Sequence, residues 1–366
     1  MSFAKSLSVL VNTALLLVLG GFLLVIGKPV LLPILAAIIV VYVLVGASEA
    51  LGRVPLIGRL PAGMRRTLVL LAFAIGLFAL TGVIVDTISQ VLSEAPAYQA
   101  NIERLIAQGA EFLGLDDRPD WQTVQNAVFG GFSVQNLINV ALTNITSIGA
   151  SVFLVTVYSA FLLAERAGFA HKLSAALRDP ASAARTEDIL RGINDRIGDY
   201  LAVKTLVNVI LGALSFVILW ALGIDFPLFW ALSIGLLNYI PYFGSLVGVL
   251  LPITLSVLQF GDLGRTLLLA TLLIAAQVWV GSFLEPRLIG RRVNLSPFVV
   301  LVSLAVWSAL WGLPGALLAV PLTSMLTIVL SAFEPTRPIA ILMADQLVRD
   351  RASPPPPPPP KRTPPA

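Results

Sequence analysis

A series of long apolar runs, from Leu7 to residue 332, constrains the fold of this chain more than any other feature. A helix of about 18 or more apolar residues is long enough to cross the hydrocarbon core of a bilayer. Charged residues make up 12% of the sequence, whereas soluble domains carry about 25%. We therefore predict an all-α polytopic membrane protein. The candidate spans are 7–26, 29–48, 67–91, 146–164, 203–222, 226–240, 244–260, 266–284, 298–311 and 316–332.

The residue types exclude several classes of chemistry. The sequence has no cysteine and a single histidine, His171. Disulfides, thiolate ligands, cysteine nucleophiles and histidine-rich metal sites are therefore excluded. A membrane enzyme needs clustered acid–base groups, and the aspartates and glutamates here are dispersed among helices and loops. We expect no enzymatic activity, no cofactor and no metal site.

The basic residues set the expected orientation. Cytoplasmic loops of membrane proteins carry an excess of lysine and arginine. Placing the N-terminus inside leaves only Lys28, Arg104, Arg118 and Arg265 of the 24 basic residues in outer segments. Both termini are therefore expected in the cytoplasm. The net charge of +4 reflects loops between spans and does not indicate a nucleic-acid partner.

Two segments outside the spans are predicted to contain amphipathic helices. Residues 93–143 lie outside, are acidic, and place apolar residues at helical spacing. Residues 165–200 lie inside, and apolar residues recur at every fourth position from Ile189 to Leu201. This inner helix either packs one face on the membrane domain or serves as a gating or partner-binding element.

The sequence ends in low complexity, with seven prolines at 354–360. Such a run favours polyproline II, so we expect a flexible tail or a ligand for an aromatic-grooved partner domain.

The predicted chain has five parts: N-terminal transmembrane helices (1–92), an extracytoplasmic helical insert (93–143), a transmembrane helix plus cytoplasmic helix (144–200), a transport core (201–333) and a cytoplasmic proline-rich tail (334–366).

The stretch "LNYIPYFGSL" interrupts an apolar segment at Asn238, Tyr239, Pro241, Tyr242 and Gly244. Proline removes a backbone amide hydrogen and clashes with the preceding turn. Irregular backbone at membrane depth is tolerated only where it is buried in protein or lines a watery cavity. We therefore predict a helical hairpin with a substrate-binding break.

A second break is predicted at "WGLPGALLAVP", where Gly312, Pro314 and Gly315 interrupt residues 298–332. The first hairpin is expected to enter from outside and the second from inside, each after a full span. Inverted pairs of span and broken hairpin are typical of secondary transporters, with the substrate site between the breaks. Two merely kinked helix pairs are the alternative.

Five other polar residues near spans are candidates. Gln277 lies deep in a span and needs a hydrogen-bond partner, so it joins the predicted substrate site. Glu285 and Arg287 form either a gate or ion-coupling site, or an anchor at the interface. Asp86 lies toward the outer end of its span and could line a vestibule. Lys204 is expected to extend toward the inner interface.

Three motifs together resemble the autoinducer-2 exporter family of bacterial permeases: "LNYIPYFGSLVG", "EPRLIGRRVNLSP" and "WGLPGALLAVPL". The resemblance covers residues 5–345, and Ser245 departs from it, since members often carry proline there. It implies an inner-membrane permease of about eight spans, homo-oligomeric, with members linked to autoinducer-2 export or to sodium/proton antiport.

These observations favour a secondary transporter that exports a small polar solute, with autoinducer-2 as the candidate permeant. The sequence contains no G-x-x-x-x-G-K-[ST] phosphate-binding loop. A sodium/proton antiporter is the first alternative, although it usually needs buried carboxylates and only Asp86 and Glu285 are available. An uncoupled channel would share the same hairpins.

Overall fold

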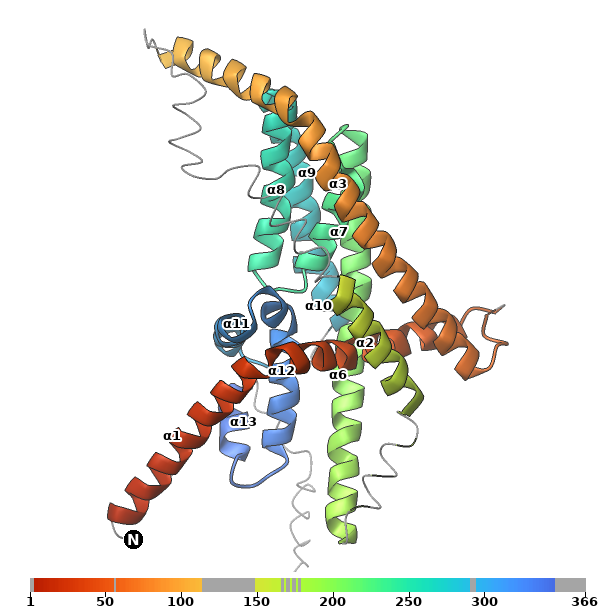
Figure 1. Cartoon of the computed structure of the whole chain (residues 1–366), viewed down its shortest axis with the longest axis vertical. Coiled ribbons are helices and arrows are strands. Elements are labelled where there is room, and N and C mark those ends of the chain that lie inside the picture. Colours follow the sequence, from red (N-terminus) through yellow and green to blue (C-terminus); the bar gives the residue numbers. More distant parts are fainter. Residues whose placement is uncertain are drawn as a thin grey trace, which may run out of the picture.

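The computed structural model describes residues 3–55, 57–113, 149–165, 168, 172, 176, 179–289 and 294–345. Within these residues the secondary structure is helical and contains no strand. Six of the described helices are long and apolar enough to cross a membrane, and four shorter apolar helices accompany them. The predicted all-α polytopic membrane fold is therefore confirmed (Figure 1).

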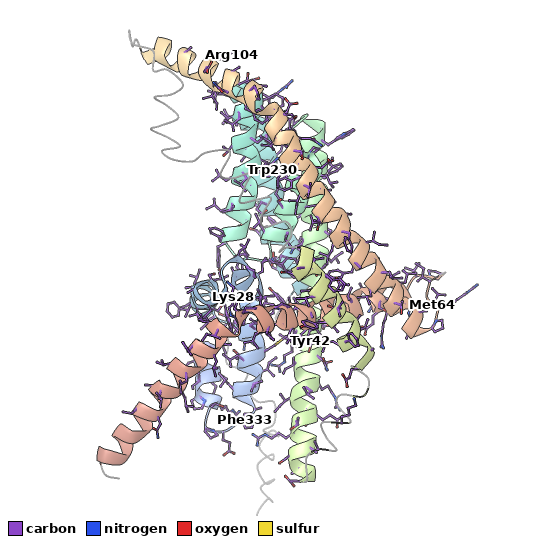
Figure 2. The ribbon with its side chains drawn as sticks, viewed as in Figure 1. Lys28, Tyr42, Met64, Arg104, Trp230 and Phe333 are labelled. Carbon is purple, nitrogen blue, oxygen red and sulfur yellow. The ribbon has the colours of Figure 1, made fainter. Side chains whose placement is uncertain are left out.

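The first two helices are separated by Gly27. Helix α1 (Phe3–Ile26) extends away from the body of the molecule, and α2 (Lys28–Gly52) crosses α6 (Pro180–Ala221) at a steep angle (Figure 1). The labelled Tyr42 lies where these two helices cross (Figure 2). Its ring contacts the place that a Cβ would occupy at Gly198 of α6, so the crossing is close.

Helix α3 (Ala62–Leu113) is a single helix of 52 residues. Its apolar part, Ala62–Val91, is a candidate span. The helix continues without interruption past residue 92, where the sequence suggested the start of a separate insert. Most of that insert, residues 114–143, lies outside the described part of the chain.

Helix α6 is also longer than one span. It joins the predicted cytoplasmic helix to the predicted span 203–222 in 42 continuous residues. At 1.5 Å per residue it is about 63 Å long, whereas the hydrocarbon core of a bilayer is about 30 Å thick. The Asp179 carboxylate caps its N-terminus by accepting hydrogen bonds from the amides of Ala181 and Ser182.

The first predicted break is present. Helix α7 (Pro227–Leu237) ends before Asn238, and α8 (Phe243–Phe260) returns beside it. The chain then turns at Gly261 into α9 (Leu263–Trp279), whose N-terminus is capped by Asp262. Helix α9 continues through the π-helix η1 (Val280–Leu284) into α10 (Glu285–Ile289).

The second predicted break is present as well. Helix α11 (Pro297–Trp311) is capped by Ser296 and ends at Gly312, which has a positive φ of 69°. Helix α12 (Leu313–Ser331) packs against α11, and the short α13 (Arg337–Met343) follows. The number of actual membrane crossings stays a prediction.

Two apolar cores lie along α6. The first-hairpin core contains Tyr98, Val207, Leu211, Leu219, Ile224, Ala231, Ile234, Val249, Leu255, Leu269, Leu273 and Val280. The second-hairpin core contains Ile39, Ile197, Tyr200, Leu201, Leu295, Trp311, Leu318, Val320 and Leu322. Figure 1 shows α7 and α9 beside the upper part of α6, with α8 against them, and α12 beside its lower part, with α13 against α12. Trp230 and Phe333 mark these two regions in Figure 2.

Candidate functional site

A group of polar side chains lies on α6 between the two apolar cores. On this helix the second-hairpin core ends at Leu201 and the first-hairpin core begins at Val207. Side chains from the first break, α9 and α10 meet the α6 residues at this level. We call this set the polar belt: Lys204, Thr205, Asn208, Asn238, Tyr239, Gln277 and Glu285.

Three amides form the centre of the belt. Asn238 Nδ2 donates to Asn208 Oδ1 over 2.8 Å, and Gln277 Nε2 donates to Asn238 Oδ1 over 3.0 Å. Asn208 and Asn238 are 5% and 6% exposed. The predicted need of Gln277 for a partner is met by Asn238. We call this row of three hydrogen-bonded amides, Asn208, Asn238 and Gln277, the amide ladder; its neighbours are 30 and 39 positions apart in the sequence.

The amide ladder has open ends. Gln277 Oε1 and Asn208 Nδ2 are buried without a hydrogen-bond partner among the described residues. Asn208 Nδ2 lies beside the Tyr239 hydroxyl but lacks hydrogen-bond geometry. Exchanging the oxygen and nitrogen positions of all three amides would reverse both hydrogen bonds. Gln277 would then hold the free donor and Asn208 the free acceptor, because each amide carries one acceptor oxygen and one donor nitrogen. One donor and one acceptor therefore remain available in either arrangement.

A second contact fastens the first break to α6. The hydroxyls of Thr205 and Tyr239 are 2.6 Å apart, and Thr205 also donates to the carbonyl of Leu201. Because the single Thr205 hydroxyl hydrogen goes to Leu201, the Tyr239 hydroxyl at the end of α7 donates to Thr205. Together with Asn208–Asn238, this contact ties two consecutive residues of the break to one face of α6.

The belt also contains a largely buried ion pair. Lys204 Nζ lies 2.5 Å from Glu285 Oε1, and the two side chains are 6% and 25% exposed. The sequence suggested that Lys204 extends toward the inner interface, and the structure instead buries it against Glu285. A charge inside a bilayer is costly unless it is paired, and removing one partner leaves the other uncompensated.

The π-helix positions the two residues that α9 and α10 contribute. Gln277 and Glu285 are eight residues apart, so a straight α-helix would place them about 80° apart around its axis, at about 100° per residue. The wider i→i+5 turns of Val280–Leu284 rotate less per residue, and Gln277 reaches Asn238 while Glu285 reaches Lys204. Such π-segments occur frequently at functional sites.

The first break places its remaining predicted residues outside the belt. Tyr242 adopts a strained φ of 61°, and the residue is 62% exposed. A Cβ at Gly244 would lie 1.7 Å from the carbonyl oxygen of Leu237, so only glycine permits α8 to approach α7 this closely. Pro241 lies in the turn between them, half-buried.

The second break combines a close backbone approach with two tryptophans. A Cβ at Gly315 would lie 2.0 Å from the carbonyl oxygen of Trp307 on α11. Trp307 Nε1 donates to Thr323, and Trp311 Nε1 donates to the carbonyl of Leu24 on α1. Gly312 and Pro314 are exposed at the tip. These contacts lie within the second hairpin or toward α1 rather than in the belt.

The two other predicted gating residues are also separate from the belt. Asp86 is exposed on α3, where Gln90 Nε2 lies 3.5 Å from its carboxylate. Arg287 is exposed on α10, two residues after Glu285. Of the predicted site residues, the structure therefore brings together Asn238, Tyr239, Gln277 and Glu285. Sequence reasoning missed Thr205 and Asn208 as members, although both lie in the same apolar run as Lys204.

Beyond the candidate span of α3, a second polar group holds this helix against the ends of the first hairpin. Tyr98 donates to Asp225 over 2.9 Å, and Gln259 Nε2 donates to the same carboxylate over 2.9 Å. Asn101 Nδ2 donates to the carbonyls of Leu258 and Gln259. Burial, followed by the bond to Asp225, raises the pKa of the Tyr98 hydroxyl above its ordinary value.

Comparison with known proteins identifies related sequences. A family model described as "AI-2E family transporter" matches residues 13–334. "Putative transport protein YhhT" of Escherichia coli K12 is 30% identical over 281 residues, which is 76% of this chain and 78% of that protein. A "Putative transport protein" of Haemophilus influenzae is 28% identical over 291 residues, 78% of this chain and 83% of that protein. "AI-2 transport protein TqsA" of Escherichia coli K12 is 33% identical over 213 residues, 58% of this chain and 61% of that protein.

Proposed function

Because this chain belongs to the AI-2E family of membrane transporters, we propose that it is a secondary permease that exports a small polar solute through the polar belt. Autoinducer-2 is the candidate permeant, since the similar TqsA is named an AI-2 transport protein. Membership of a transporter family also favours transport over enzymatic activity.

The amide ladder is the observation that carries this proposal. It holds an open donor and an open acceptor, on Asn208 and Gln277, at a broken helix within an apolar protein. A buried polar atom without a partner costs about 1–3 kcal/mol. A hydroxylated solute that accepts from one end and donates to the other would remove that cost, and this gain offsets part of the solute's own desolvation.

The two breaks have different roles in this proposal. Asn238 and Tyr239 contact the permeant directly from the first break, with Pro241, Tyr242 and Gly244 shaping the turn. Gly312, Pro314 and Gly315 approach it from the other side of the membrane in the opposite conformation. Alternating access of this kind is typical of inverted hairpin pairs.

One observation favours a second candidate function. The Lys204–Glu285 pair places a carboxylate inside the helical bundle, 25% exposed. Intramembrane carboxylates commonly serve as proton or cation sites. A sodium/proton antiporter with Glu285 as its coupling group is therefore the alternative, with Arg287 and Asp86 at the entrances. An uncoupled channel through the same belt is the third candidate.

The wider setting follows from the same proposal. The chain is a multi-pass membrane protein, and we place it in the bacterial inner membrane with both termini in the cytoplasm. We further propose a homo-oligomer, with 93–143 outside and the proline-rich 334–366 inside. The permeant and the lipid bilayer are then its main partners.

Cysteine accessibility tests the permeation path, because the chain has no cysteine of its own. Three variants on α9 form a matched set. Gln277→Cys lies in the belt, Leu273→Cys lies in the first-hairpin core (1% exposed), and Leu267→Cys lies on the exposed surface of the helix bundle (66% exposed). We expect a membrane-impermeant thiol reagent to label Gln277→Cys alone, and autoinducer-2 to slow that labelling.

The hairpin tips extend the same test to both sides of the membrane. Phe243→Cys and Leu313→Cys lie at the two tips and are 56% and 55% exposed. The proposal requires labelling of one from outside and the other from inside. An unreactive Gln277→Cys together with two unreactive tips would mean that both breaks are packed kinks, and the permease site would be rejected.

A further inference from the structure

The ion pair of the polar belt lies next to the amide ladder. Lys204 and Asn208 are four residues apart on α6, so their side chains are neighbours on one helix face. Across the belt, Glu285 and Gln277 are brought toward the same side by the π-helix. A solute held at the Asn208 end of the ladder would therefore lie about one helical turn from Lys204 and its partner Glu285.

The other members of the belt are uncharged. Thr205, Asn208, Asn238 and Gln277 do not titrate. Tyr239 and the neighbouring Tyr200, which is 6% exposed and close to Glu285, carry neutral hydroxyls at ordinary pH. The charge of the belt is therefore set by Lys204 and Glu285, and the pair keeps it at zero.

We propose that the Lys204–Glu285 pair is the charge filter of this permease. By keeping the path electroneutral, it excludes small ions of both signs while a neutral polar solute passes. This proposal rests on the proposed function, since it assumes that the path runs through the belt. It assigns specificity to Lys204, a residue whose location in the sequence suggested only an interface role.

The physical basis is the cost of an ion in a low-dielectric path. A small ion entering an electroneutral constriction loses its hydration without gaining a fixed countercharge. Unpaired basic side chains make pores selective for anions, and unpaired acidic side chains make them selective for cations. Separating the two charges of the belt should therefore convert exclusion into selectivity, with the sign set by the charge that remains.

The decisive variant leaves one permanent positive charge. Arginine stays protonated in proteins, so K204R/E285Q carries an unpaired cation, whereas K204R alone keeps the pair and is the matched control. Each full-length protein is reconstituted into phosphatidylethanolamine/phosphatidylglycerol liposomes. Chloride efflux is measured with an ion-selective electrode while valinomycin and potassium balance the charge. We expect about tenfold faster chloride efflux from K204R/E285Q than from K204R, equivalent to about 1.4 kcal/mol.

A second variant covers the opposite sign, and also the case in which K204R/E285Q does not fold. K204M leaves Glu285 unpaired, and at pH 8 it should admit sodium but not chloride. The neutral double variant K204M/E285Q should exclude both ions, as the wild type does. Equal ion leakage from folded K204R/E285Q, K204M and K204R would overturn the filter and leave the pair a structural anchor.

Other outcomes separate this proposal from the function on which it rests. Sodium flux coupled to proton flux in the wild type would contradict the filter and support antiport through Glu285. If the variants show the expected sign-selective leaks but the wild type shows no saturable autoinducer-2 flux, the filter is retained and autoinducer-2 export is rejected. Saturable autoinducer-2 flux in the wild type, without ion leaks in the variants, would retain autoinducer-2 export and reject the filter.

Discussion

The two helix breaks share a close backbone approach at a glycine and differ in the side chains around it. In each, a glycine lets the second helix pass so close to the first that a Cβ would collide with a carbonyl, at 1.7 Å for Gly244 and 2.0 Å for Gly315. Around the first break, Asn238 and Tyr239 form hydrogen bonds with α6 and α9. Around the second, Trp311 packs among apolar side chains.

This difference separates the hairpin shape from the binding chemistry. Glycine and proline are sufficient to form a break, because they change the backbone alone. A binding site also needs polar side chains that converge from other helices. Only the first break provides them among the described residues, so the second break is expected to act through backbone approach and packing.

The largest expected effect is a loss of stability that is similar for both hairpins. Gly244→Ala and Gly315→Ala each force a methyl group into a backbone carbonyl, and we expect losses of about 3 kcal/mol or more in the free energy of unfolding. Unfolding in mixed detergent micelles measures this quantity. Gly82→Ala on α3, where nothing lies within 4 Å of the added Cβ, is the control and should be harmless or stabilising. A well-folded Gly315→Ala protein would show that the two breaks differ in backbone as well.

The next largest effect is confined to the polar belt. Lys204→Met leaves Glu285 unpaired and should lower the free energy of unfolding by about 3 kcal/mol, because an isolated buried charge is costly. The double variant K204M/E285Q should recover much of this loss. Arg191→Met removes an exposed pair with Glu187 (63% and 54% exposed) and should cost less than about 1 kcal/mol. Similar losses for Lys204→Met and Arg191→Met would contradict the assigned burial.

Transport should distinguish the breaks most directly. Asn238→Leu removes the centre of the amide ladder, and we expect solute flux to fall about tenfold, as for a loss of about 1.4 kcal/mol. Thr323→Val in the second hairpin leaves Trp307 Nε1 without its acceptor. That change should cost about 1–3 kcal/mol of stability and leave flux per folded protein unchanged. The comparison is wrong if Thr323→Val lowers flux as strongly as Asn238→Leu.

A smaller effect is expected within the first break. Tyr239→Phe removes the hydroxyl that contacts Thr205 and should lower stability by about 1 kcal/mol. Tyr242→Phe changes an exposed ring at the same turn and should change little. Thermal unfolding of the two variants side by side measures the difference, and equal melting temperatures would count against the Thr205 contact.

The smallest effect concerns the end of the first hairpin that α3 contacts, where Tyr98 donates to Asp225. The raised pKa of Tyr98 means that its neutral hydroxyl is favoured in the folded state. This stability is present below about pH 10, the ordinary tyrosine value, and is lost as pH rises further. Hydrogen exchange of α3 residues 95–105 should therefore accelerate at alkaline pH in the wild type. Tyr98→Phe should show faster exchange at neutral pH and a weaker alkaline rise.

Apolar length and the positions of proline and glycine predicted both breaks and the helices beside them, but not the continuation of α3 past residue 92 or the length of α6. The predicted segments 298–311 and 316–332 became Pro297–Trp311 and Leu313–Ser331. The predicted segment 226–240 became Pro227–Leu237. These features are local: apolar length sets a span, and proline with glycine removes the hydrogen bonds that would continue it.

Which polar residues meet follows from the packing of the helices and was not predicted. Lys204 and Glu285 are 81 positions apart, and no pattern along the chain pairs them. The sequence indicated that Gln277 lies deep in a span, but its partner Asn238 follows from the packing of α7 and α9 on α6. The π-helix at Val280–Leu284 then aims two residues of one helix toward the same belt. Periodicity specifies the face of a helix, whereas the neighbour of that face depends on how every helix packs.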